Sequence, residues 1–317
     1  MIVKRISFLF IFSIVLASLC CGGKTKNKAA TNISDTRIAV YIGDELYPDG
    51  TTGPATTVTT LQQSPLTSPI LGLVNYNQST NSLVFNDGSR DIFNITGEYI
   101  GSSEWPALIQ SLRGGNIREL YLSFSTSGSG FMGKLISSNP AAAAKILSYI
   151  KNNLGFDGID LDYEGSDFST TSPVYTVALA AINVGLKVTA APYWGKENWQ
   201  SWVTYVQANN GTVSWLNLQC YSGGNFNNPG DWLDLGVPIV AGSCANCGAI
   251  CTPVDMQNLF TLWRTGQSPA PISASCWGGT PNTSPQAIGG GFIWVYDAIA
   301  GTQFLPYMNA LKTGLGM

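Results

Sequence analysis

Four acidic residues lie within eight positions in the segment 157–164, which reads Asp-Gly-Ile-Asp-Leu-Asp-Tyr-Glu. Side chains alternate between the two faces of a β-strand, so Asp160, Asp162 and Glu164 share one face. Carboxyl groups this close cannot all ionise cheaply, and burial raises the cost further. Such a set is suited to general acid–base chemistry. Glu164 stands last, at the carboxyl end of the strand, and is the candidate acid.

The opposite face of the same segment is apolar, with Ile159, Leu161 and Tyr163. Two other interpretations of the acids are a solvated acidic edge and a Ca²⁺ or Mg²⁺ site built from carboxylates. The apolar face, together with Gly155 and Gly158 at the start of the segment, favours a buried strand over both. No metal is therefore predicted. No cofactor is predicted either, because no glycine-rich phosphate loop follows an early strand.

The composition excludes several other kinds of chemistry. The chain of 317 residues has no histidine, which rules out Ser-His-Asp and Cys-His nucleophile systems and histidine zinc sites. The net charge is only −3, and no run of Lys or Arg occurs beyond the first residues, so nucleic acid is not an expected partner. The reaction must run on carboxylates, Tyr, Lys, Cys or backbone groups.

Strand-like and helix-like segments alternate from residue 37 to the end, which predicts an α/β fold with a parallel sheet. One predicted helix is capped by Asn139 and closed by Gly155, and another spans Pro253–Thr265 before Gly266. Eight strands in one domain favour a single (β/α)8 TIM barrel over an open doubly wound sheet. The predicted strands are Arg37–Ile42, Pro69–Tyr76, Ile117–Ser125, Phe156–Tyr163, Lys187–Pro192, Ser214–Tyr221, Val237–Gly242 and Gly291–Tyr296.

The acidic segment resembles the Asp-Gly-x-Asp-x-Asp-x-Glu signature of glycoside hydrolase family 18, with every defining position present. Further segments resemble the short, single-domain plant-type chitinases of that family: Ala190-Ala191-Pro192, Gln219-Cys220-Tyr221 and Gly291-Phe292-Ile293-Trp294. The resemblance spans about residues 37–313. Only the carboxylate motif is highly specific by itself.

This resemblance implies a retaining hydrolase in which the substrate's own 2-acetamido group, and no enzyme nucleophile, attacks the anomeric carbon. It implies that Glu164 is the acid, that Asp162 orients the acetamido group and that Asp160 supports Asp162. Tyr221 would hydrogen-bond the acetamido group and Trp294 would stack under the sugar ring. The expected partner is chitin or an oligosaccharide of N-acetylglucosamine, cleaved in endo fashion.

Two departures from the family pattern bear on the substrate. The third strand ends in Ser123-Phe124-Ser125-Thr126 where the family has Ser-x-Gly-Gly, and Tyr221 is followed by Ser222 where many chitinases have Asp. An endo-β-N-acetylglucosaminidase acting on N-glycans therefore remains an alternative. A lectin that binds chitin without cleaving it is another, although the intact Glu164 favours an enzyme.

The predicted substrate-binding set also includes Gln219, Tyr163, Trp194 and Trp277. Trp194 and Trp277 fall near predicted strand ends, where loops would line a sugar groove. Aromatic rings bind sugar faces well, but each of these two indoles could equally serve packing.

Four cysteines gather late in the chain, at Cys244, Cys247, Cys251 and Cys276. Their spacing would suit a four-cysteine zinc site in a cytosolic protein. In an exported protein two disulfides are favoured, with a connectivity that the sequence does not determine. Cys220 is expected to point outward under the helices as a buried free thiol.

The amino terminus resembles an export signal, predicted over residues 1–20 and followed by a polar linker over 21–35. Lys4 and Arg5 precede the apolar run Ile6–Leu19, which is too short to span a bilayer. The cysteines at positions 20 and 21 resemble the lipid attachment site of bacterial lipoproteins. We expect a secreted or cell-surface monomer with the barrel over residues 36–317, and a lipid anchor is one of the two forms that the leader allows.

Overall fold

The computed structural model describes residues 35–48, 54–86, 90–245, 247, 251–274 and 276–317. The predicted signal peptide and all but the last residue of the predicted linker lie outside these ranges. None of the described helices is long and apolar enough to cross a membrane.

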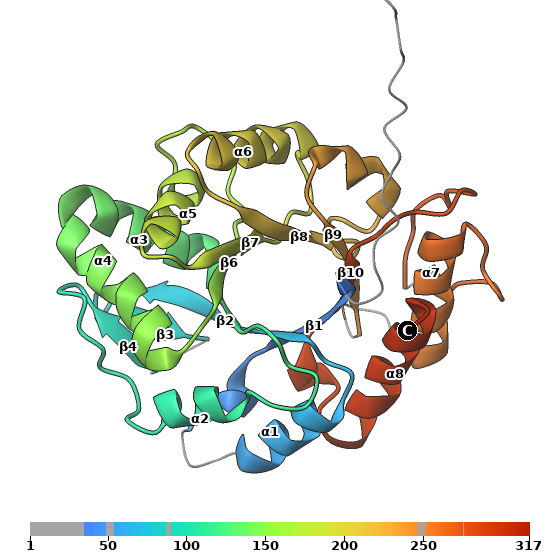
Figure 1. Ribbon diagram of the computed structural model, residues 1–317, viewed down its shortest axis with the longest axis horizontal. Coiled ribbons are helices and arrows are strands. Elements are labelled where there is room, and N and C mark those ends of the chain that lie inside the picture. Colours follow the sequence, from blue (N-terminus) through green and yellow to red (C-terminus); the bar gives the residue numbers. More distant parts are fainter. Residues whose placement is uncertain (1–34, 49–53, 87–89, 246, 248–250, 275) are drawn as a thin grey trace, which may run out of the picture. The chain divides into compact units, whose positions relative to one another are not determined.

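Eight parallel strands form a closed barrel, which confirms the predicted fold (Figure 1). The first strand, β1, pairs with β10 on one side and with β2 on the other. This second pairing closes the sheet, so the open-sheet alternative is wrong. The barrel strands, in chain order, are β1 Arg37–Ile42, β2 Ser68–Asn77, β5 Tyr121–Ser125, β6 Gly158–Asp162, β7 Lys187–Ala190, β8 Val213–Gln219, β9 Ile239–Cys244 and β10 Gly290–Trp294.

Helices surround the barrel (Figure 1). The two helices predicted from their boundary residues, after Asn139 and over Pro253–Thr265, are both present. The Asn139 side chain accepts the Ala142 N–H at the start of α4, and Gly155 ends the π-helical continuation of that helix at φ 81°. The α-helices are α1 Pro54–Gln63, α2 Trp105–Ser111, α3 Thr126–Ser138, α4 Pro140–Tyr149, α5 Pro173–Asn183, α6 Lys196–Ala208, α7 Pro253–Thr265 and α8 Phe304–Gly314, and the π-helical turn is Ile150–Leu154.

Alternation along the strands produces two separate apolar clusters. The larger one lies between the sheet and the helices and contains the outward-facing side chains of the strands, for example Ile159 and Leu161 of β6. The smaller one fills the barrel interior and includes Tyr121 and Trp215, whose rings meet edge to face at 4.7 Å. The interior is therefore a packed core, and space for a ligand is left near the carboxyl ends of the strands.

Two features differ from the sequence-based expectation. A hairpin of β3 (Ser82–Phe85) and β4 (Asp91–Asn94) extends β2 in an antiparallel arrangement. Each of these two strands has only four residues, which is too few for an alternation of apolar and polar side chains to be recognised in the sequence. The third barrel strand also begins at Tyr121, later than the predicted Ile117.

Candidate active site

The strand β6 directs its acids to the inside of the barrel, as the alternation predicts. Asp160 is fully buried and Asp162 is 8% exposed, while Glu164 lies two residues beyond the strand and is exposed. The three carboxylates therefore run from the core to the mouth at the carboxyl end of the barrel. Active sites of such barrels are found at this end.

Asp160 is held by four hydrogen bonds from four other strands. Oδ2 accepts the Tyr41 hydroxyl at 2.9 Å and the Ser123 hydroxyl at 2.8 Å. Oδ1 accepts the Thr189 hydroxyl at 2.7 Å and the Asn217 amide at 3.0 Å. Burial raises the pKa of Asp160, and these bonds oppose the rise by favouring the carboxylate. Asp160 is thus fixed in place by neutral donors that engage both of its oxygens.

Asp162 has a less polar setting. Its Oδ1 accepts the side-chain amide of Gln219 at 3.2 Å, and that amide also donates to the Ala191 carbonyl at 2.9 Å. Burial raises the pKa of Asp162 well above its usual range, and the charges of Asp160 and Glu164 raise it further. Asp162 therefore takes up a proton far more readily than a solvated aspartate does.

The Glu164 backbone is fixed while its carboxyl group faces open space. Its N–H donates to the Thr126 hydroxyl at 2.8 Å, which ties the end of β6 to the start of α3. In the same segment the Ser125 hydroxyl caps α3 by accepting the Gly128 N–H. Of the two residues that depart from the family's third-strand pattern, Ser125 therefore caps α3 and Thr126 fixes the Glu164 backbone, while Ser123, which matches the pattern, holds Asp160.

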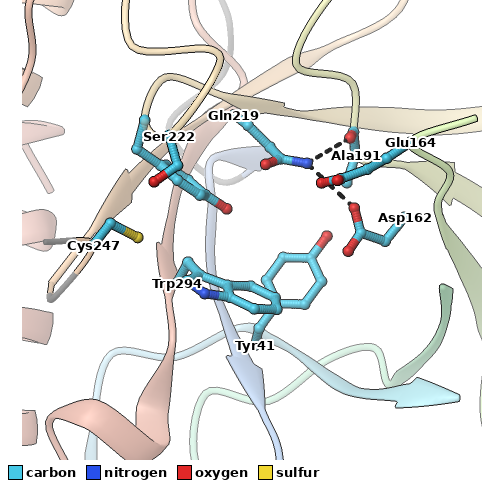
Figure 2. Close-up of a pocket in the computed structure, with 9 residues that line it drawn as sticks. Tyr41, Asp162, Glu164, Ala191, Gln219, Ser222, Cys247 and Trp294 are labelled. Carbon is cyan, nitrogen blue, oxygen red and sulfur yellow. Dashed lines mark hydrogen bonds between the residues drawn. The ribbon is translucent and has the colours of Figure 1, made fainter. Parts of the chain in front are cut away.

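A cavity of about 240 Å³ opens beside these carboxylates. Figure 2 shows Asp162, Glu164 and Gln219 on one side, Ser222 and Cys247 on the other, and Trp294 with Tyr41 between them. The complete lining is Tyr41, Asp162, Glu164, Ala191, Gln219, Tyr221, Ser222, Cys247 and Trp294. The four predicted catalytic residues are brought together: three line the cavity, and Asp160 lies beneath it, bonded to Tyr41 of the lining.

Aromatic side chains provide the remaining chemistry of the cavity. The Trp294 and Tyr41 rings pack with centroids 5.2 Å apart. Tyr221 is buried against Phe292, and burial together with the charge of Asp162 raises its pKa well above the usual value. Tyr221 consequently keeps its hydroxyl proton and is a hydrogen-bond donor at any ordinary pH.

Three predicted substrate-binding residues do not line this cavity. Tyr163 is buried among the helices and donates its hydroxyl to the Asp167 carbonyl at 3.0 Å, so its inclusion in the binding set is corrected. Strand alternation is the reason, since it turns Tyr163 away from Asp162 and Glu164. Trp194 is 39% exposed outside the cavity, and Trp277 is 6% exposed and lines a neighbouring cavity.

Four lining residues were not among the predicted site residues: Tyr41, Ala191, Ser222 and Cys247. A signal for Tyr41 existed, because it stands near the carboxyl end of the first predicted strand, where barrel active sites gather. Cys247 carried no such signal, because its position depends on a disulfide.

The late cysteines form two disulfides, Cys244–Cys247 and Cys251–Cys276, as favoured over a zinc site. Cys220 is free and buried in the layer under the helices, which confirms its predicted direction. Within the described ranges no group of three or more His, Cys, Asp or Glu side chains is arranged to hold a metal ion.

No family model and no curated protein matches this sequence. Solved structures of chitinases do match its fold. A GH18 chitinase from Pseudoalteromonas aurantia superposes with a TM-score of 0.59 at 16% identity, covering 88% of this chain and 100% of the other. The catalytic domain of a GH18 chitinase from the fern Peteris ryukyuensis gives 0.55 at 18% identity, covering 89% and 100%. The catalytic domain of a chitinase from Pyrococcus furiosus gives 0.56 at 11% identity, covering 90% and 97%. The resemblance to this family is confirmed at the level of the fold.

Proposed function

We propose that this protein is a chitinase-type glycoside hydrolase, which cleaves β-1,4-linked N-acetylglucosamine polymers with retention of configuration. The observation that carries the proposal is the placement of Asp162 and Glu164 together in one cavity over Trp294. The acidic motif and the barrel shared with GH18 chitinases give independent support.

In the proposed reaction Glu164 is the general acid. Its proton passes to the glycosidic oxygen as the bond from that oxygen to the anomeric carbon breaks. The 2-acetamido oxygen of the same sugar attacks the anomeric carbon and forms an oxazolinium ring. Water then opens this ring at the anomeric carbon, and Glu164 recovers a proton from that water. The exposed position of Glu164 at the mouth supports both proton transfers.

Asp162 is proposed to orient and stabilise the acetamido group. Positive charge develops on this group as the ring forms, and a carboxylate held nearby stabilises that charge. Burial raises the pKa of Asp162, and the same burial strengthens its attraction to a positive charge, so charge developing on the acetamido group would favour the ionised carboxylate. Gln219 and Asp160 position Asp162: Gln219 donates to it, and Asp160 lies two residues back on the same face.

Tyr221 and Trp294 are proposed to complete the sugar site. The Tyr221 hydroxyl remains protonated and is proposed to donate to the acetamido oxygen. The Trp294 ring lines the cavity and is proposed to stack under the reacting sugar. Aromatic contacts of this kind are worth about 0.5–1.5 kcal/mol beyond the area they bury.

Turnover of three matched substrates tests this proposal. Chitotriose should be cleaved with retention, and a cellulose-type trisaccharide should not, since it lacks the 2-acetamido group. Cleavage only of a high-mannose glycopeptide would favour the endo-β-N-acetylglucosaminidase alternative. Tight binding of chitotriose without cleavage of any substrate would favour a lectin. The sizes of products released early from long chains would test endo cleavage.

We also propose that the protein is exported, to the medium or the cell surface. The two disulfides support this, because such bonds persist mainly in oxidising compartments. The mass of the protein isolated from its native host tests the proposal. We expect the first residues, roughly 19 of them, to be missing from the mature protein. An additional mass that matches attached lipid would show that the protein also carries a lipid anchor.

A further inference from the structure

Basic side chains gather at the amino end of the barrel, opposite the active site. Arg37 and Lys187 are the first residues of β1 and β7, and Arg118 shortly precedes β5. Arg113 follows the end of α2, and Lys151 lies in the π-helical turn before β6. The amino ends of parallel strands meet at one end of a barrel, so these five residues share one face, which we call the basic face.

The charge of the basic face contrasts with that of the rest of the barrel. All 19 acidic residues of the chain lie beyond residue 34, whereas five of the 16 basic residues precede it, so the barrel as a whole is acidic. The active-site end holds several of these acids, in the segments that follow β1, β6 and β10: Asp44, Glu45, Glu164, Asp167 and Asp297. The two ends of the barrel therefore differ in the sign of their charge.

Helix ends explain only part of this polarity. The carboxyl end of a helix favours a basic side chain, which accounts for Arg113 and Lys151. Arg37, Arg118 and Lys187 stand where strands begin, and strands have only small net dipoles. Their gathering on one face is therefore a separate feature of this chain.

Three acids lie near these bases without cancelling their charge. Glu119 pairs with Lys187 at 2.6 Å, and Asp157 pairs with Arg113 at 3.0 Å. The third acid, Asp35, is exposed. Five bases against three acids leave an excess of positive charge. The side chains of Lys187 and Arg113 are still 50% and 42% exposed, so a partner outside the protein can reach them.

An open hollow of about 730 Å³ lies in the basic face. Its lining includes Arg113, Lys151 and Lys187 together with one acid, Asp157. The Lys151 ammonium donates to the Val184 carbonyl at 2.9 Å, and an ammonium group has three such donors. The hollow thus presents several cationic donors to an anionic group such as the phosphate of a lipid.

The basic face is also where the chain enters the barrel, because Arg37 begins β1. Residues 21–34 join this point to the predicted signal peptide and, even fully extended, would span at most about 50 Å. They include three lysines and no acidic residue. A lipid on Cys20 or Cys21, which is one form of the proposed export, would therefore keep the basic face within reach of a membrane.

We infer that the basic face is a docking surface for an anionic lipid membrane, and that docking turns the active site away from the membrane. The inference rests on the proposed export and not on the proposed reaction. Anionic headgroups attract Lys and Arg over about 8 Å at physiological salt. Each such residue near the surface strengthens binding by roughly fivefold. The same headgroups repel the acidic end, so the catalytic cavity faces outward, toward a polymer in the medium.

Vesicle sedimentation tests the docking. The protein begins at residue 20, keeps every described residue, and carries Cys20→Ser and Cys21→Ser so that no lipid can be attached. It is mixed with vesicles of phosphatidylcholine alone or of phosphatidylcholine with phosphatidylglycerol. We expect binding to the anionic vesicles only, and weaker binding as the salt concentration rises.

Two double variants assign the binding to the basic face. Lys151→Gln combined with Lys187→Gln should lower the affinity for anionic vesicles about tenfold or more. Lys134→Gln combined with Lys196→Gln is the matched control, because it removes the same charge from the active-site end. Lys196 begins α6 there, and Lys134 follows Gly133, which faces the start of α5. The control should change the affinity by less than about twofold.

A fluorescent probe on an introduced thiol reports the orientation. Asn152→Cys places the probe in the hollow, and Ser166→Cys places it on an exposed residue just beyond Glu164. Within the described ranges the native cysteines do not compete for the label, since Cys220 is buried and the others form disulfides. Anionic vesicles should shift the emission of the probe at position 152 and leave that at position 166 unchanged.

The outcomes keep this inference apart from the proposed reaction. Equal binding to neutral and anionic vesicles would overturn the docking surface, as would an unchanged affinity in the Lys151 and Lys187 variant. A shift at position 166 instead of position 152 would overturn the orientation. Absence of chitotriose turnover in the parent protein would count against the hydrolase alone, because vesicle binding is measured without substrate.

Discussion

The Tyr41 hydroxyl lies 2.9 Å from Oδ2 of Asp160, and the two residues are 119 positions apart in the chain. Tyr41 is on the first barrel strand and Asp160 on the fourth, so this bond crosses the barrel interior. It joins the floor of the catalytic cavity, which Tyr41 lines beside Trp294, to the buried acid beneath it. The stability of the barrel and the geometry of the site are therefore linked through one carboxylate.

Replacing Asp160 tests this link. Asp160→Ala leaves four buried donors without their acceptor, and an unpaired buried polar group costs about 1–3 kcal/mol. We expect the free energy of unfolding in urea to fall by on the order of 3 kcal/mol or more. Asp160→Asn should cost much less, because the Tyr41 and Ser123 hydroxyls can turn to accept from the new amide. Equal losses in the two variants would contradict this account.

Asp162 should make the wild-type protein less stable as the pH rises. Its pKa is raised in the folded state, so the folded protein binds more protons than the unfolded chain. The stability contributed by the protonated group is complete below the unfolded pKa, about 3.9, and is lost as the pH climbs toward the folded value. Asp162→Asn removes this loss and keeps an acceptor for Gln219.

Thermal unfolding between pH 4 and pH 8 measures the effect. The melting temperature of Asp162→Asn relative to wild type should increase with pH. A difference that stays constant, or that shrinks as the pH rises, would show that Asp162 is not the group responsible.

Glu164→Gln keeps the shape of the side chain but cannot donate a proton. General acid catalysis typically contributes 10²–10⁴-fold, so turnover of chitotriose should fall by about that factor or more. Binding should be largely retained, because the fold around the Thr126 contact is unchanged. Turnover close to that of the wild type would remove Glu164 from its proposed role.

Trp294→Ala should weaken substrate binding and slow the reaction. Loss of a stacked aromatic ring costs about 0.5–1.5 kcal/mol beyond the buried area, or roughly 2–13-fold in affinity. Trp294→Phe is the matched control and should recover part of the loss. Because Trp294 packs against Tyr41, either variant could also lower the stability of the fold. Thermal unfolding of both variants separates such a loss of stability from a loss of sugar binding. Unchanged kinetics in the Ala variant would place the sugar elsewhere.

Cys220 should resist modification until the protein unfolds. It is buried and free, and burial raises the pKa of its thiol, so little reactive thiolate forms. Alkylation followed by peptide mass mapping should label Cys220 only after denaturation. The four late cysteines should stay unlabelled without a reductant. Rapid labelling of Cys220 in the native protein would contradict its burial.

The sequence alone determined the features that depend on neighbours along the chain. The spacing of the acids in the segment 157–164 placed three carboxylates on one strand face, because side chains alternate along a strand. Asn139 and Gly155 marked the ends of a helix, because caps satisfy local backbone groups. Eight alternating units indicated the barrel, and all eight predicted barrel strands are present, several with shifted ends.

The tertiary structure decided what depends on the register between strands and on loops that meet in space. Neither the bond from Tyr41 to Asp160 nor the entry of Cys247 into the catalytic cavity follows from any local pattern. The bond between Cys276 and Cys251, which precedes α7, likewise joins two segments whose pairing the sequence left open. These contacts join residues far apart in the chain, and only closure of the barrel brings them together.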